Sequence, residues 1–533
     1  MSGGGTMDRG MAQTEHGRAG LPWWFPLAVA LVLGFFMQGS RGLYESTEGR
    51  YSECAREMVA SGDLMVPVLN GEPHWTKPPL TYWAIAAGTF ALGNTAWGVR
   101  LYLVVAFGLT VLAVHCLEGA IRGKPATGYA ALLYATAPYT VGGANIASTD
   151  TLLTLWEAWA MAFFWLAHRD GRRRFVILMW ASLGLAFATK GPVGLFPLIG
   201  IVPANRLLWR RSQGKVRLWD PYGAAVFALL GLSWYAYVVV RNPALLRGWF
   251  MEELVGRTVL DAHARLSSKP HKLLSVYLPI LLLGAGVWVP FVWYRGRKYL
   301  HRGLLRRLVS SQRDGAAWLF LMLAVAVPTA IFSASSSRLP LYLLPVFPPM
   351  AVAIAWALVR LQTRHRTILR LALGTAVVVA GAKAVAAHKS SWKDMTELAE
   401  AAESVPPDGG EHPRVALFRT PLNGLSFHLD ETVPVLYAGG SASQGELKRQ
   451  IEETGGLVPL RAVANGEKLA LRQRKGRACF ALPRGSDIIV RRKDVRNFGP
   501  LLDEERWQVV GETRHWQILR LRLPLEVLSD SAA

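Results

Sequence analysis

Residues 151–209 read TLLTLWEAWAMAFFWLAHRDGRRRFVILMWASLGLAFATKGPVGLFPLIGIVPANRLLW. This stretch holds three apolar blocks, at about 151–167, 174–189 and 191–209, and a run of arginines separates the first two. An α-helix needs roughly 20 mostly apolar residues to cross about 30 Å of hydrocarbon. Each block therefore has about the length of one membrane-spanning helix.

Similar blocks occur along the first three quarters of the chain, which has 533 residues, 51% of them hydrophobic and 18% charged. A soluble protein has about a quarter of its residues charged. This composition excludes a soluble enzyme, a disordered chain and a secreted disulfide scaffold, and only three cysteines are present. The candidate spans lie at about 21–39, 79–93, 99–117, 125–142, 151–167, 174–189, 191–209, 221–240, 273–294, 316–333, 340–359 and 367–387.

The charged loops between these blocks predict the topology. The chain carries 59 Lys and Arg against 37 Asp and Glu, a formal charge of +22. The positive charges gather in every second loop, which is typical of cytoplasmic loops, so we interpret the charge as a topology signal and expect no nucleic-acid partner. Strongly basic loops follow residues 117, 167, 209, 294 and 359.

This alternation holds if the block at 79–93 does not cross the membrane. The block is short, starts at Pro78-Pro79 and ends at Gly93-Asn94, which is typical of a surface or half-inserted segment. About eleven spans then remain, with the N-terminus inside and the C-terminus outside, and 11–13 if that block does cross. Residues 1–20 are expected to form a cytoplasmic tail, followed by an uncleaved first helix.

The last part of the chain, residues 390–533, has ordinary soluble composition. A helix-like stretch at Trp392 to Ala402 precedes short apolar runs spaced like strands, which predicts a small α/β domain on the outer face. The expected strands lie at Val415–Phe418, Val433–Tyr437, Ala478–Leu482, Ile488–Val490 and Trp516–Leu521.

The first outward loop, 40–78, is rich in polar side chains. Acidic residues just beyond a spanning helix can bind a divalent ion or act as a general base, which makes Glu48 a candidate. Arg50 and Lys77 are candidates for holding a phosphate. The alternative is that 48–60 is an amphipathic surface helix; on that interpretation Glu53, Arg56 and Glu57 face water.

Two further outward segments each carry one notable charge. Asp150 precedes an apolar run, where a buried carboxylate is a functional hypothesis, the alternative being that Thr149 or Asp150 caps the next helix. Lys190 lies between two spans on the outer side, against the charge bias, so we expect it to have a partner; the alternative is a snorkelling lysine.

The last two outward loops offer imidazoles and another arginine. His263 and His271 lie in the long loop 241–272, where they either bind a metal or are solvated. Arg338 lies in the small polar loop that begins at Ser333, which is either a phosphate site or a tight connector.

Together these loops predict an outward cavity that fits a phosphorylated lipid, with its head group at the interface and its tail in the bilayer. The chain has no Walker-type glycine loop, no Gly-x-Ser-x-Gly and no His-Glu-x-x-His, which disfavours ATP hydrolysis, serine hydrolysis and zincin proteolysis.

Five motifs, in order, resemble those of the GT-C polytopic glycosyltransferases, and the most similar group is the bacterial aminoarabinose (lipid A) transferases, relatives of the protein O-mannosyltransferases. The resemblance covers about residues 20–390. It rests on Glu48-Gly49-Arg50-Tyr51 with Ala55-Arg56-Glu57-Met58, on Lys77-Pro78-Pro79-Leu80, on Asp150, on Thr189-Lys190-Gly191-Pro192, and on Ser336-Ser337-Arg338-Leu339-Pro340-Leu341-Tyr342.

The resemblance implies an α-helical polytopic protein of the bacterial inner membrane, with a GT-C domain at 21–389 and a periplasmic α/β domain at 390–533. It implies an inverting, metal-assisted transferase that takes a sugar from a polyprenyl-phosphate carrier. The acceptor is a lipid, a glycan or a protein. The implied site has Glu48 or Asp150 as the base, with carrier-phosphate contacts from Arg50, Lys77, Lys190, Arg257, Arg338 and Tyr342.

The chain departs from the family pattern at two positions. Thr47 stands where the family usually has Asp, and Thr76 stands where Glu commonly precedes Lys-Pro-Pro. Glu48, Glu45 and His74 lie close enough in sequence to substitute for the missing base and metal ligand. The candidate ligands of a divalent ion are Glu45, His74, His263 and His271.

Other functions stay open at this stage. A carrier-lipid binder or flippase would need the cations but not Glu48 or Asp150. A secondary transporter predicts short loops and paired halves, which the long loops at 40–78 and 241–272 disfavour. A structural scaffold leaves the outward clustering of charged residues unexplained.

Overall fold

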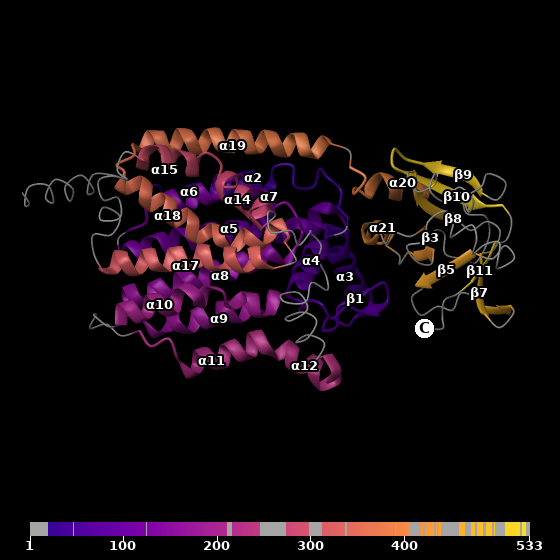
Figure 1. Ribbon diagram of the computed structural model, residues 1–533, viewed down its shortest axis with the longest axis horizontal. Coiled ribbons are helices and arrows are strands. Elements are labelled where there is room, and N and C mark those ends of the chain that lie inside the picture. The colour runs from indigo at the N-terminus through magenta and orange to yellow at the C-terminus, as the bar shows by residue number, and fades with distance from the viewer. Residues whose placement is uncertain are drawn as a thin grey trace, which may run out of the picture. The chain divides into compact units, whose positions relative to one another are not determined.

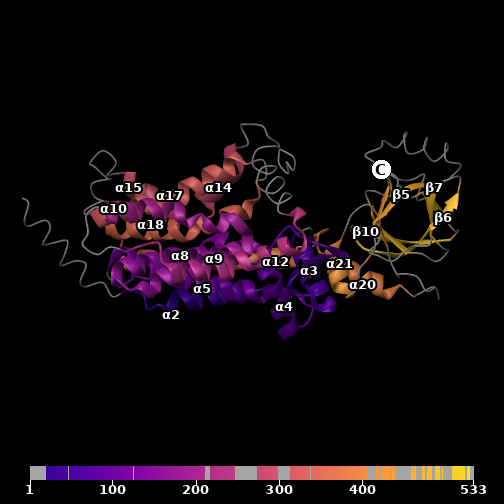
Figure 2. The same cartoon turned by 90° about the horizontal axis from the view of Figure 1, so that it is seen from below.

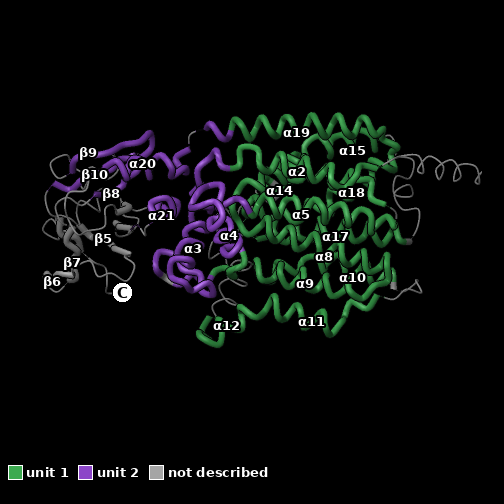
Figure 3. The backbone as a smooth tube through the Cα atoms, turned by 180° about the vertical axis from the view of Figure 1, so that it is seen from behind, with its two compact units in different colours: residues 1–38, 76–80, 102–385 green, residues 39–75, 81–101, 386–533 purple. Residues whose placement is uncertain are grey.

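The computed structural model is mostly helical and divides into two compact units (Figure 1, Figure 3). Unit 1 comprises residues 1–38, 76–80 and 102–385, and unit 2 comprises 39–75, 81–101 and 386–533. The structure describes residues 20–45, 47–123, 125–209, 216–245, 273–297, 312–335, 338–389, 391–405, 416–418, 422–430, 433, 435–438, 458–463, 471–474, 477–482, 487–492, 495, 507–522 and 525–528.

Unit 1 is a bundle of apolar helices, and α8, α9, α10, α17 and α18 run alongside one another (Figure 1, Figure 2). All the predicted apolar blocks are helical, which confirms the helical class. The elements are α2 (Trp24–Phe35), α5 (Ala96–Arg122), α6 (Tyr129–Thr136), α7 (Pro138–Gly143), α8 (Thr149–Asp170), α9 (Arg173–Lys190), η1 (Gly191–Leu195), α10 (Pro197–Trp209), α11 (Pro221–Phe227), η2 (Ala228–Leu232), α12 (Ser233–Arg241), α14 (Leu273–Leu283), α15 (Trp288–Gly296), α17 (Gln312–Ala334), η6 (Pro340–Val346), α18 (Phe347–Arg360) and α19 (His365–His388).

The described residues contain six helices that are long and apolar enough to cross a membrane, or seven if α14 and α15 form one span bent by 75°. The sequence predicted 11–13 spans, and several of the predicted blocks are broken or short in the structure. Pro138 divides the block at 125–142 into α6 and α7, because proline has no N–H to continue the helical ladder. The first block is also shorter than predicted, since α2 has 12 residues, or about 18 Å at 1.5 Å per residue.

The helix α4 (Leu80–Leu92) corresponds to the block that was predicted not to cross. Its 13 residues extend about 20 Å, short of the roughly 30 Å of hydrocarbon. Its length therefore agrees with a surface or half-inserted segment. All but Leu80 of this helix belong to unit 2.

Unit 2 combines the first outward loop with the C-terminal part of the chain. The predicted domain boundary at 389/390 falls near the observed one at 385/386, but unit 2 also takes residues 39–75 and 81–101, which the sequence had assigned to the membrane domain. Besides α4, it holds α3 (Thr47–Ser61), β1 (Val68–Leu69), β2 (Glu72–Pro73), α20 (Thr396–Ser404) and α21 (Asn423–Leu429).

A nine-stranded mixed sheet, counted over the described residues, has the order β6-β7-β11-β5-β4-β3-β8-β10-β9. All five predicted strands are present, as β3 (Ala416–Phe418), β4 (Val435–Ala438), β7 (Arg477–Leu482), β8 (Asp487–Arg491) and β10 (Trp516–Leu521). The prediction missed β5 (Val458–Val463), β6 (Leu471–Arg474), β9 (Trp507–Glu512) and β11 (Leu525–Leu528). Two of these strands give weak signals, since β5 contains Pro459 and β6 has only one apolar residue.

The helix α3 is buried on most of its surface, which corrects the interpretation that its polar residues face water. Glu53 is fully buried and forms an ion pair with Arg56 at 2.8 Å. Glu57 accepts hydrogen bonds from the backbone N–H groups of Asn70 and Gly71, at 2.8 and 2.9 Å. These partners explain the burial, because a carboxylate leaves water only where charges or donors replace the lost hydration.

The short helix α21 packs directly against α3. A Cβ atom on Gly49 of α3 would lie 2.5 Å from the backbone nitrogen of Gly424 in α21. The same N–H of Gly424 donates to Glu45 Oε1. Burial raises the pKa of the Glu45 carboxyl to about 7, against the opposing effects of the Gly424 N–H and the Arg50 charge. Residues at 45–49 thus depend on a segment almost 400 residues away.

We expect the substitution Gly49→Ala to destabilise the protein by about 1–3 kcal/mol, because the added methyl group has no room against α21. The measurement is the apparent melting temperature of the purified protein. Gly142→Ala serves as the matched control, since a Cβ there meets no atom within 4 Å. Equal melting temperatures for the two variants would contradict the close approach of α3 and α21.

We expect Glu45→Gln to stabilise the protein at pH 8 and to change little at pH 4.5. A carboxyl whose pKa is raised from 4.5 to about 7 on folding favours the folded state fully at low pH, and this contribution is lost as the pH rises through 7. The gain at pH 8 is at most on the order of 3 kcal/mol. Melting temperatures measured at both pH values test this, and a variant with the wild-type pH dependence would argue against it.

Candidate active site

The position of Asp150 is fixed by the first turn of α8. Ser148 is the N-cap, and its hydroxyl accepts a hydrogen bond from the Asp150 N–H at 3.2 Å. The prediction that Thr149 or Asp150 caps this helix is therefore wrong. Tyr102 holds the cap from α5, since its hydroxyl donates to the Ser148 carbonyl and accepts from the Ser148 N–H. The Asp150 carboxylate is thus left to make contacts outside its own helix.

Asp150 and Lys190 form a buried ion pair. Lys190 is the last residue of α9, and its Nζ lies 2.5 Å from Asp150 Oδ1, with the two side chains about one tenth exposed. The same ammonium lies 4.2 Å from the centre of the Tyr342 ring in η6. The expected partner of Lys190 is confirmed, and three elements, α8, α9 and η6, meet at this charge.

Arg338 lies close to the same group of residues. It is 4% exposed, and its Nε donates to the carbonyl of Ser333 at 3.1 Å. The Tyr277 hydroxyl of α14 donates a hydrogen bond to the Leu339 carbonyl. The charges of Arg338 and Asp150 both act on this hydroxyl. The structure therefore brings together the predicted residues Asp150, Lys190, Arg338 and Tyr342, and adds Tyr277, which the sequence analysis missed.

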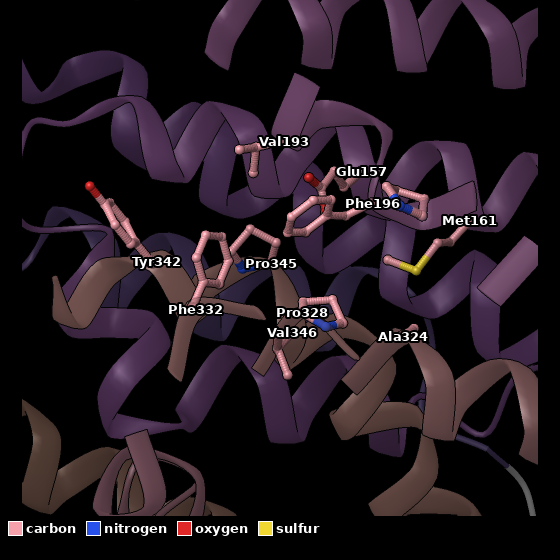
Figure 4. A pocket seen from close by; sticks show the side chains of 11 residues that line it. Glu157, Met161, Val193, Phe196, Ala324, Pro328, Phe332, Tyr342, Pro345 and Val346 are labelled. Carbon is pink, nitrogen blue, oxygen red and sulfur yellow. The ribbon is translucent and has the colours of Figure 1, made fainter. Parts of the chain in front are cut away.

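An apolar pocket begins at Tyr342 (Figure 4). Side chains from α8, η1, α10, α17 and η6 line the pocket. All but two of the lining side chains are apolar. The two polar side chains are Tyr342 and Glu157 of α8. The apolar lining includes Met161, Val193, Phe196, Phe332, Pro345 and Val346.

Glu157 was also missed by the sequence analysis. It is 4% exposed, and among the described residues no hydrogen-bond partner lies at its Oε1. The signal was available, because an ionisable residue inside an apolar block is a functional-site hypothesis by default. Glu157 also lies seven residues after Asp150, so the two carboxyls fall on nearly the same face of α8.

A second buried charge supports the loop that precedes α8. The Lys383 ammonium of α19 donates to the carbonyls of Leu33 and Gly34 at the end of α2, at 2.8 and 3.2 Å. It also contacts Gln38, whose amide donates to the Ala144 carbonyl at 2.9 Å. A cation is favoured at a helix C-terminus, which explains why Lys383 lies at the end of α2. Through Lys383 and Gln38, α19 is joined to α2 and to the loop that leads to Ser148.

In unit 2, Glu48 is enclosed by two arginines. Arg100 contacts both carboxylate oxygens at 2.8 and 2.9 Å, and Arg41 contacts Oε2 at 2.6 Å. Burial alone would raise the pKa of Glu48, but Arg100 and Arg41 together lower it to about 2. The Tyr44 N–H also donates to Oε2.

These contacts do not fit the prediction that Glu48 is the general base. A base must have a lone pair directed at the substrate and a pKa near the working pH. Glu48 is fully buried, and its oxygens already accept four hydrogen bonds. Glu48 therefore has a structural role, because its carboxylate joins the start of α3 to Arg100 of α5.

Of the other residues that were predicted to contact the phosphate, Arg50 and Lys77 lie in the described part of the chain. Arg50 lies on α3 with its guanidinium 5.5 Å from the centre of the Tyr51 ring. Lys77 is partly buried and belongs to unit 1. Arg257 lies outside the described residues.

The predicted metal ligands form no complete site in the part of the chain that the structure describes. No group of three or more His, Cys, Asp or Glu side chains gathers there. Glu45 is engaged by the Gly424 N–H, and its raised pKa makes protons compete with a metal near neutral pH. The described candidates Glu45 and His74 therefore do not fit a divalent ion by themselves, and His263 and His271 lie outside the described residues.

The chain is similar to known membrane glycosyltransferases. Residues 76–237 match the family model PMT_2, described as dolichyl-phosphate-mannose-protein mannosyltransferase. Two curated relatives carry the name undecaprenyl phosphate-alpha-4-amino-4-deoxy-L-arabinose arabinosyl transferase. The one from Edwardsiella ictaluri is 30% identical over 65% of this chain, and the one from Pseudomonas aeruginosa (strain UCBPP-PA14) is 30% identical over 67%. The chain spans 61% and 62% of these relatives' lengths.

Solved structures give the fold over nearly the whole chain. ArnT from Cupriavidus metallidurans bound to undecaprenyl phosphate matches with a TM-score of 0.66 and 20% identity, covering 93% of this chain and 97% of that chain. Its apo form matches with a TM-score of 0.65. The fold of this multi-pass membrane protein is thus similar to that of ArnT. The chain is thus similar in sequence to glycosyltransferases that are named for dolichyl-phosphate and undecaprenyl-phosphate sugars.

Proposed function

We propose that the protein transfers a sugar from a polyprenyl-phosphate donor to an acceptor at the outer face of the bacterial inner membrane. The observation that carries this proposal is the site in unit 1, where a paired carboxylate and ammonium lie at the polar end of an apolar pocket. A phosphorylated polyprenol has the same two parts, a charged head group and an apolar tail.

The names of similar proteins support the choice of donor. The curated relatives are named for an undecaprenyl-phosphate-linked amino sugar, and the solved ArnT is bound to undecaprenyl phosphate. The proposed donor is therefore an undecaprenyl-phosphate sugar. The acceptor is a lipid, a glycan or a protein that reaches the outer face, with lipid A as the first candidate.

In the proposed reaction, Asp150 acts as the general base. Lys190 contacts Oδ1, so Oδ2 takes the proton of the acceptor hydroxyl. The acceptor oxygen forms a bond to the sugar C1 from the face opposite the phosphate. The bond between C1 and the phosphate oxygen breaks, and its electron pair leaves with the carrier phosphate, so the anomeric configuration inverts.

The cations of the site stabilise the leaving phosphate. Lys190 is already held over Tyr342, and Arg338 is buried nearby, so their charges need little reorganisation when the phosphate arrives. Lys77 is proposed as a further contact. No step is assigned to a divalent ion, because the described candidates do not form a site for one.

We propose the orientation that the loop charges predict, with the N-terminus in the cytoplasm and unit 2 on the outer side. In this orientation the end of α9 at Lys190 and the start of α8 at Asp150 both face outward. The C-terminal part of unit 2 then lies in the periplasm, where an acceptor arrives.

We expect Asp150→Asn to reduce sugar transfer by about 100-fold or more while carrier binding persists, because the variant loses the base but keeps the cations. The measurement is label transfer from radiolabelled undecaprenyl-phosphate sugars in membranes. Asp170→Asn, at the other end of α8 in an exposed ion pair, is the matched control and should transfer at the wild-type rate. Binding without transfer in the wild type, under every donor tried, would favour a carrier-lipid binder or flippase.

We expect Lys190→Met to weaken the binding of undecaprenyl phosphate by about 10- to 100-fold, with partial recovery in Lys190→Arg, because the variant loses a charge-assisted contact to the phosphate. Binding to the purified protein is the measurement. Lys389→Met, a change at an exposed lysine, is the control. Unchanged affinity in Lys190→Met would remove this residue from the proposed phosphate site.

A further inference from the structure

Glu157 lies where the polar end of the site meets its apolar floor. It lines the pocket together with Tyr342, and the charges of Lys190 and Asp150 both act on it. Figure 4 shows its side chain beside Phe196 and Val193. The carboxyl is thus close enough to the ion pair to sense an anion that binds there.

The surroundings of Glu157 favour its neutral form. Its side chain is 4% exposed, and the other pocket residues from η1, α10 and α17 carry no charge. A buried carboxylate without a partner is costly, and such a group keeps its proton instead. Among the residues that the structure describes, the cation that acts on Glu157 is Lys190, which is already paired with Asp150 at 2.5 Å.

A neutral carboxyl is a hydrogen-bond donor, whereas an ionised one only accepts. This difference matters beside a phosphate, because a carboxylate repels an anion and a carboxylic acid binds it. Among the described residues, Glu157 Oε1 has no partner, so one of its oxygens is available to a ligand.

We propose that Glu157 is a further ligand-binding residue of this site, which donates a hydrogen bond in its protonated form to the phosphate of the bound polyprenyl carrier. The inference rests on the proposed function and deepens it by naming a neutral donor among the cations. Two carboxyls on one face of α8 then have opposite tasks, with Asp150 accepting a proton and Glu157 keeping one.

The test compares Glu157→Gln with Glu157→Leu in the purified full-length protein. Glutamine keeps a neutral donor of the same size, while leucine keeps the volume and removes the donor. At pH 6.5 we expect Gln to bind undecaprenyl phosphate within about twofold of the wild type and Leu to bind about tenfold more weakly or worse, the loss expected for a hydrogen bond to a charged group. Undecaprenol, which lacks the phosphate, should bind all three proteins alike.

Controls separate the possible outcomes. Glu118→Gln and Glu118→Leu change another buried glutamate, on α5, and should leave binding unchanged. If Gln binds as weakly as Leu, or if Leu binds like the wild type, Glu157 does not act as a neutral donor. If Leu weakens undecaprenol equally, the residue shapes the pocket only. A wild type that does not bind undecaprenyl phosphate at all would instead overturn the proposed function.

Discussion

A charge that leaves water must be paired, and in this protein the pair of Asp150 and Lys190 meets that requirement between two helices of an apolar bundle. The pair joins the first turn of α8 to the last residue of α9. It also positions the ammonium over Tyr342, so that η6 lies at the same charge. Because breaking one partner would strand the other in a low dielectric, the geometry of the polar site is tied to the stability of the bundle.

The same requirement explains the acidic residues of the first outward loop. Glu48 is held by Arg41 and Arg100, and Glu57 by two backbone N–H groups, so these carboxylates serve the structure of unit 2. The absence of the usual acidic residue at Thr47 therefore leaves Asp150 as the carboxylate best placed for chemistry. The role of a motif residue thus depends on which of its oxygens remain available after folding.

The helices are interrupted next to Arg338 and Lys190, and these interruptions help to shape the candidate site. Arg338 lies in the loop between α17 and η6, and the turn after Lys190 begins with Gly191 at a φ of +66°. Backbone that leaves the helical conformation at membrane depth is tolerated only where protein or a cavity surrounds it. Irregular backbone here adjoins a pocket with a polar end and an apolar floor, which is the shape that a phosphorylated polyprenol requires.

The sequence by itself determined the helical class, the apolar blocks, five strands of the outer sheet and the identity of the cations, because hydrophobic period and charge placement are local properties. Lys190 was recognised because its charge opposed the topology bias. Only the tertiary structure decided which charges meet: it enclosed Glu48 between arginines at 41 and 100, buried Glu53 and Glu57, and left Glu157 Oε1 without a hydrogen-bond partner among the residues that the structure describes. These outcomes depend on contacts between segments up to several hundred residues apart, and no local pattern encodes how a carboxylate's oxygens are shared among distant donors.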